Sequence, residues 1–156
     1  MEKYRTNTLY FTYHFTCSPN EITAIDKRDT AKILSIDIFF TIKINNQLYF
    51  QADLPAFEFY KALAKWQKKW LKNQQAAFYY FSIEYDEGAI LEMIPFHQLA
   101  RLNTSWPEAE VYNVFAHQYL VNELSLLEGN LKNDIERYFD IKISSFMPHI
   151  PYREEC

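Results

Sequence analysis

The chain has 156 residues, a net charge of −4 and 23% charged residues, values typical of a globular protein long enough to build a core without metal or disulfide bridges. Two glycines are too few for a glycine-rich phosphate-binding loop, and the negative net charge disfavours a general nucleic-acid binder. No apolar run approaches the roughly 20 residues that span a bilayer, so we expect no membrane partner.

Three strands are predicted in the N-terminal third. Apolar and polar side chains alternate over residues 9–16, which is typical of a half-buried strand. Residues 17–30 are polar and predict a loop, and the alternation over residues 34–44 predicts a second strand. Asn45 and Asn46 tolerate a positive φ and are predicted to form a hairpin turn, after which residues 48–51 return as a third strand.

A helix is predicted over residues 55–73, because Pro55 suits the first turn of a helix. Trp66 and Trp70 fall on one side of this helix and are expected to pack on the sheet. The opposite side is a basic face, which we expect to be solvated, and it consists of Lys61, Lys65, Lys68, Lys69 and Lys72.

The C-terminal half predicts a hairpin, two further strands and a second long helix. Residues 77–85 and 89–96 are predicted to pair around Asp86, Glu87 and Gly88, with Ile83 opposite Leu91. Residues 98–104 and 111–116 are additional strand candidates, and an apolar stripe with helical spacing predicts a helix over 117–139. Residues 148–156 are expected to form a polar tail that packs poorly.

This order of elements predicts a single α+β domain over residues 1–156. Strands joined by hairpins imply a mainly antiparallel β-sheet, and the two helices are expected to pack on one face of it, as in a sandwich.

The predicted hairpin places acidic and apolar side chains together on the sheet face away from the core. Carboxylates beside tyrosine and isoleucine are typical of an interface with an acidic rim. We therefore predict a partner-binding surface made of Tyr80, Glu84, Asp86, Glu87, Ile90, Glu92 and Ile94.

Residues with catalytic or metal-binding chemistry are scattered along the sequence. The four histidines, His14, His97, His117 and His149, show no metal-ligand spacing, and no pair of cysteines is spaced as a zinc site requires. Cys17 and Cys156 are expected to be reduced, which points to the cytoplasm. We predict no catalytic residue, no metal and no cofactor.

In size, acidity and its 18% aromatic content, the whole chain is similar to the small cytosolic immunity proteins that bacteria pair with secreted toxins. The resemblance implies binding to another protein, such as a basic toxin or enzyme, and no motif carries it. We therefore predict a non-catalytic protein-binding module. Two alternatives stay open: an enzyme that uses surface carboxylates or histidines, and a weak nucleic-acid binder acting through the basic face. The sequence does not define the oligomeric state.

Overall fold

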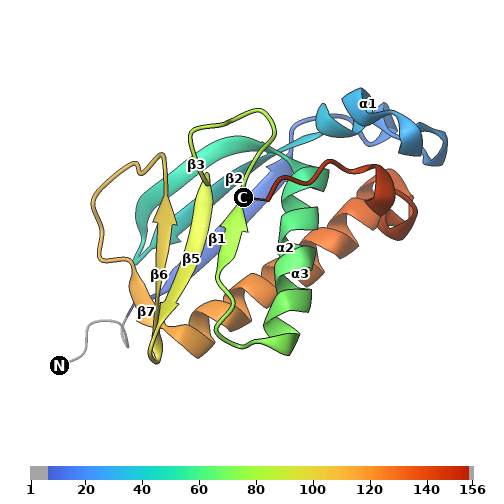
Figure 1. Ribbon diagram of the computed structural model, residues 1–156. Helices are drawn as coiled ribbons and strands as arrows, with labels where there is room; N and C mark the ends of the chain where they lie inside the picture. The colour runs from blue at the N-terminus through green and yellow to red at the C-terminus, as the bar shows by residue number, and fades with distance from the viewer. Residues whose placement is uncertain (1–6, 155–156) are drawn as a thin grey trace.

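The computed structural model describes residues 7–154 (Figure 1). Its strands are β1 Leu9–Phe15, β2 Asp37–Ile44, β3 Gln47–Pro55, β4 Phe78–Tyr80, β5 Leu91–Phe96, β6 Leu99–Thr104 and β7 Val114–Ala116. Its α-helices are α1 Thr30–Leu34, α2 Ala56–Lys72 and α3 His117–Phe139. Short 3-10 segments precede α1, at Pro19–Glu21 and Ala24–Arg28, and follow α3, at Ile143–Ser145 and Met147–His149.

The strands form two antiparallel sheets, ordered β1-β2-β3 and β4-β5-β6-β7. In Figure 1 the four-stranded sheet lies in front of the three-stranded sheet, and α2 and α3 cross beside them. The ring of Phe59 on α2 lies 5.1 Å from that of Phe40 in β2 and 5.1 Å from that of Tyr80 in β4, between ring centroids. Helix α2 therefore packs against both sheets, and the predicted α+β sandwich is confirmed.

The first sheet follows the predicted alternation, with differences at its borders, and β3 runs from Gln47 to Pro55 where the sequence predicted a strand over residues 48–51. The Asn45–Asn46 turn is confirmed, since both residues have positive φ angles of 53° and 66°. Residues 34–36 are not part of the second strand, and the polar segment before them is not entirely a loop. A carboxylate oxygen of Asp29 accepts a hydrogen bond from the amide of Lys32 at 3.1 Å, which caps α1 and delays the strand until Asp37.

The side of α2 that carries the tryptophans faces inward, as predicted. Trp66 is 3% exposed, and its ring meets that of Phe78 in β4 edge-on, with 6.1 Å between centroids. Trp70 lies 6.5 Å from Trp66 between centroids but is only partly buried, at the border of the core. Trp66 is therefore the stronger anchor between α2 and the sheet.

The predicted register between β4 and β5 is wrong. Tyr80, rather than Ile83, lies opposite Leu91, which is a shift of three residues along the first strand. An odd shift exchanges the two faces of a strand, so the odd-numbered and even-numbered side chains change places. The connection is accordingly a ten-residue loop over residues 81–90, in place of a tight turn at residues 86–88.

Helix α3 begins and ends where the sequence predicts, at His117 and Phe139. The predicted stripe is buried at Leu120, Leu124, Leu127, Leu131 and Ile135. Asp140 ends the helix in the left-handed conformation with φ of 54°, and its amide donates to the carbonyl of Glu136.

The segment after α3 makes specific contacts as far as Glu154, contrary to the expectation of a tail that packs poorly, and it is buried at Ile150. Ile150 is 2% exposed. The ammonium group of Lys61 donates hydrogen bonds to the carbonyls of Met147 and Ile150, at 2.7 and 2.8 Å. These two backbone carbonyls are therefore paired within the protein, whereas in a loose tail they would bind water. Residues 155–156 of the predicted tail lie outside the described residues.

Candidate functional site

The loop over residues 81–90, which we call the acidic loop, is fixed by a buried carboxylate. Glu58, in the first turn of α2, is 1% exposed. Its carboxylate accepts a hydrogen bond from the hydroxyl of Tyr80 at 2.6 Å and another from the amide of Ile83 at 3.1 Å. Burial raises the pKa of Tyr80, and the adjacent Glu58 carboxylate raises it further, so the phenol remains a donor.

A turn at Ser82 then presents the acidic side chains to solvent. The Ser82 hydroxyl accepts from the amide of Glu84 at 3.2 Å, and the Ser82 carbonyl accepts from the amide of Tyr85 at 3.2 Å. Glu84, Asp86 and Glu87 are exposed on this loop. These three predicted site residues are therefore accessible to a partner.

Two aspartates from the first sheet join this end of the molecule, and we call Asp37, Asp53, Glu84, Asp86 and Glu87 together the acidic end. The pKa of Asp37 is raised by burial and then by the negative charges of Asp53 and Glu84. The ion pairs found within residues 7–154 join Lys32 to Glu21, Lys69 to Glu154 and Arg137 to Asp134, and none of them involves the acidic end. Its negative charge is left without a paired cation inside the described chain.

Apolar side chains are exposed beside the acidic end. Ile83 in the acidic loop is 46% exposed, and Trp106, in the β6–β7 connection, is 37% exposed. The ring of Trp106 meets the ring of Tyr85 edge-on at 4.9 Å between centroids, so the two connections touch. An aromatic anchor with carboxylates around it is the composition of many protein interfaces.

Two of the predicted site residues are buried, and their assignment to an outer surface is wrong. Tyr80 is 0% exposed and Ile90 is 3% exposed. The three-residue shift of register turns Tyr80 into the core, and Ile90 closes the loop through its amide, which donates to the Tyr80 carbonyl at 2.9 Å. Neither side chain is able to contact a partner in this conformation.

Glu92 and Ile94 do share the outer face of the second sheet, as predicted. Tyr79 lies opposite Glu92, and Arg101 lies opposite Ile94 in the strand register. Tyr79 is 42% exposed, and it takes the place on this face that the sequence assigned to Tyr80. The predicted surface is thus divided between this face and the acidic end.

The predicted basic face of α2 is partly used inside the molecule. Lys61 binds two backbone carbonyls, Lys65 lies over the ring of Tyr152 at 5.4 Å, and Lys69 pairs with Glu154 at 2.8 Å. Lys68 and Lys72 are exposed. Because three of the five lysines hold residues of the same chain, less of the face is available to a polyanion than the helical wheel suggests.

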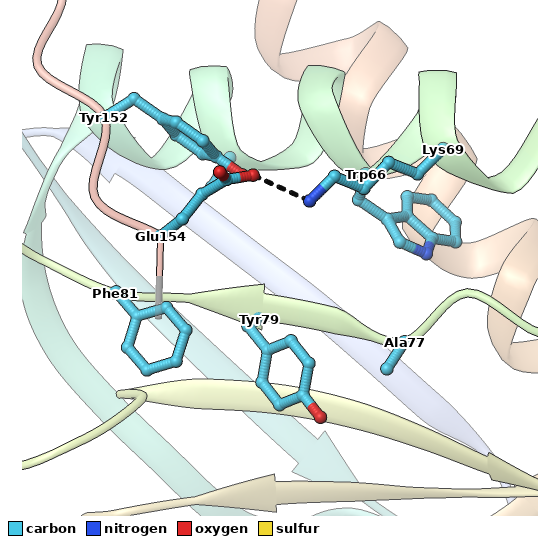
Figure 2. Close-up of a pocket in the computed structure, with 8 residues that line it drawn as sticks. Trp66, Lys69, Ala77, Tyr79, Phe81, Tyr152 and Glu154 are labelled. Atoms are coloured by element: carbon cyan, nitrogen blue, oxygen red, sulfur yellow. Dashed lines mark hydrogen bonds and ion pairs between the residues drawn. The ribbon is translucent and has the colours of Figure 1, made fainter. Parts of the chain in front are cut away.

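A groove of about 300 Å³ lies between α2, β4 and the segment that carries Tyr152. In Figure 2, Tyr152 and Glu154 extend toward Lys69 and Trp66, while Ala77, Tyr79 and Phe81 line the opposite side along β4. A wider hollow of about 580 Å³ lies between β1 and α3, where the hydroxyl of Tyr13 donates to Asp134 at 2.5 Å. Burial, followed by the Asp134 hydrogen bond, raises the pKa of Tyr13, which keeps its proton.

Over residues 7–154, no group of three or more His, Cys, Asp or Glu is arranged to hold a metal ion. Burial raises the pKa of the Cys17 thiol, and Glu21 and Asp37 raise it further, which opposes formation of the nucleophilic thiolate. Within the same range, no helix is both long and apolar enough to cross a membrane.

The residues that sequence reasoning missed are Glu58, Asp37, Asp53 and Arg153. Glu58 carries the clearest signal, because it is one carboxylate inside the apolar run Ala56–Tyr60 and therefore needed buried donors. Arg153 gives no local sequence signal, because its guanidinium binds the carbonyls of Ser82 and Tyr85, which are about 70 residues away in the sequence.

Comparison with known proteins gives a family and no function. Residues 11–137 match the model of the family described as Domain of unknown function (DUF7878). No curated protein and no solved structure matches the chain.

Proposed function

The chain belongs to the DUF7878 family, and for this member we propose non-catalytic binding of another protein through the acidic end. The observation that carries the proposal is the concentration of carboxylates from three segments at one end of the molecule, where the pKa of Asp37 is raised by burial and then by the charges of Asp53 and Glu84. Like charges held together oppose folding, and a cationic partner would relieve that repulsion.

The partner that suits this surface is a basic protein. Glu84, Asp86 and Glu87 would steer it electrostatically, and exposed Ile83 and Trp106 would supply apolar contact area near the centre. We place Tyr79, Glu92 and Ile94 on the outer face of the second sheet as a flanking contact.

In this role the protein acts as an inhibitor of a toxin or enzyme whose basic site it covers, in the manner of a bacterial immunity protein. It works in the cytoplasm and needs no cofactor. The support for this reading is the combination of a net charge of −4, exposed carboxylates at one end and apolar side chains beside them.

Affinity capture from the native host tests the proposal. The bait is the wild-type protein, and the test variant is Glu84→Gln/Asp86→Asn/Glu87→Gln, which removes three negative charges. The matched control adds three positive charges on the exposed side of α3, by Asn122→Lys/Asn130→Lys/Asn133→Lys, so that both variants have the same net charge.

We expect the wild type and the control to retain a basic protein that the test variant loses. Equal retention of that protein by the test variant would exclude the acidic end as its binding site. A wild type that retains no protein would contradict the binding function itself.

A further inference from the structure

Residues Ile150–Glu154, which we call the strap, lie across α2 and the end of β4. The strap is anchored at one end, where Ile150 is 2% exposed and Lys61 holds its carbonyl at 2.8 Å. Beyond this anchor the contacts are open to solvent, since the paired side chains of Lys69 and Glu154 are each 56% exposed. The outer end can therefore leave its place while Ile150 remains in the core.

Each side chain at the outer end of the strap contacts a different set of residues. Tyr152 lies under the ammonium group of Lys65, and Glu154 pairs with Lys69. The guanidinium of Arg153 donates to the carbonyls of Ser82 at 3.1 Å and Tyr85 at 2.5 Å. The Arg153 guanidinium also lies 5.8 Å from the ring centroid of Phe81.

The backbone of the strap begins to extend the second sheet. β4 is at one edge of that sheet, and Phe81, directly after it, forms an antiparallel bridge with Arg153. Extended peptides add to a sheet at an exposed edge strand. Backbone hydrogen bonds then give affinity, and pockets for the peptide's side chains give specificity. Figure 2 shows the strap on one side of the groove and β4 on the other.

We propose that α2 and the edge of β4 form a binding site for an extended peptide with the pattern aromatic–arginine–acidic, which the chain's own strap occupies. Arginine is selected because its Nη1 donates to two carbonyls of the turn at Ser82 while its planar guanidinium lies over the ring of Phe81. The acidic residue is selected by Lys69 and the aromatic one by Lys65. A partner protein that carries this pattern competes with the strap for the site.

This site goes beyond the proposed function, because it uses neither the carboxylates of the acidic end nor a basic partner. The two sites are nevertheless linked through one turn. Arg153 holds the carbonyls of Ser82 and Tyr85, and Glu84, one of the two residues between them, belongs to the acidic end. Loss of the Arg153 contacts would release this turn.

The experiment removes the outer end of the strap and supplies it separately. A chain that ends at Pro151 keeps the Ile150 anchor, and the probe is the acetylated and amidated peptide Pro-Tyr-Arg-Glu-Glu, the sequence of residues 151–155. Binding is followed by the amide NMR signals of Phe81, Ser82 and Tyr85. A control peptide carries Gln in place of Arg.

A tethered segment has an effective concentration of about 1 mM, so a strap that stays closed requires a Kd of the free peptide below about 1 mM. We expect saturable shifts of the three signals at such concentrations, loss of binding with the Gln peptide, and weaker binding to the full chain, whose own strap competes at an effective concentration of about 1 mM. Absence of saturation by about 5 mM peptide would overturn the proposal.

A second variant covers the case in which the shortened chain does not fold. In the full chain with Arg153→Gln, the strap loses its bonds to the Ser82 and Tyr85 carbonyls, and the free peptide should bind more tightly than it binds the wild type. Peptide binding that is the same for this variant and the wild type would contradict intramolecular occupancy.

Discussion

Replacing Glu58 should destabilise the protein strongly, although it is a single carboxylate on a helix. Glu58→Ala removes the acceptor of the Tyr80 hydroxyl, which has no access to water at 0% exposure, and of the Ile83 amide. An unsatisfied buried donor costs about 1–3 kcal/mol, and bonds to a charged group are at the upper end of that range. We therefore expect the free energy of unfolding to fall by about 2–4 kcal/mol, a large share of a typical 5–15 kcal/mol.

The double-mutant cycle with Tyr80→Phe isolates the bond between the two side chains. Tyr80→Phe alone should cost about 1.5–3 kcal/mol, because it removes one of the two donors to the buried carboxylate. The double variant should cost at least about 1 kcal/mol less than the sum of the single variants. Urea denaturation gives the three values. Additive costs within about 0.5 kcal/mol, or a cost of Glu58→Ala below about 0.5 kcal/mol, would refute this account of the loop.

Three further outcomes follow from burial and charge. Trp66→Ala should lower the free energy of unfolding by about 3–5 kcal/mol, and Trp70→Ala should lower it by less, because Trp66 is buried and Trp70 only partly so. Lys68→Ala should change the free energy of unfolding by no more than about 0.5 kcal/mol, and denaturant melts of the three variants give these values. The pKa of Asp37 is raised in the folded state, so ionisation of its carboxyl destabilises the protein as pH rises above the unfolded pKa of about 3.9. Asp37→Asn should therefore have a higher Tm than the wild type at pH 7 but not at pH 3. Equal Tm values of the variant and the wild type at pH 7 would contradict this prediction. Tyr80 also has a raised pKa, so its stabilisation is lost as pH rises above about 10, and an ultraviolet titration should show its ionisation only together with unfolding.

The elements that the sequence predicts well are those whose signal is local. The alternation of β1, the Asn45–Asn46 turn and the apolar stripe of α3 each depend on neighbouring residues only, and all three appear as predicted. Pro55 locates the start of α2 to within one residue, although it ends β3 and precedes the helix, where the sequence predicted it in the first helical turn.

The β4–β5 register was not predictable from local residues. Asp86, Glu87 and Gly88 have the composition of a tight hairpin turn, whereas the core position of Tyr80 depends on distant residues, the carboxylate of Glu58 and the ring of Phe59. Since an odd shift exchanges the faces, the observed register takes Tyr80 out of the candidate site and brings Tyr79 into it.

The strap was missed for a related reason. Its residues are polar, and polar residues at a chain end usually remain solvated. Here the partners of Tyr152, Arg153 and Glu154 lie on α2 and in the acidic loop, some 70 to 90 positions away, and no local pattern identifies them.

The association rate of the captured partner, measured as a function of salt, tests the role of the acidic end most directly. We predict that kon of the wild type falls by roughly tenfold or more between about 20 and about 300 mM salt. At low salt, Glu84→Gln/Asp86→Asn/Glu87→Gln should lower kon, whereas the control with three lysines on α3 should leave kon nearly unchanged. A kon that is independent of salt, or equal losses in the variant and the control, would contradict electrostatic docking at this end of the molecule.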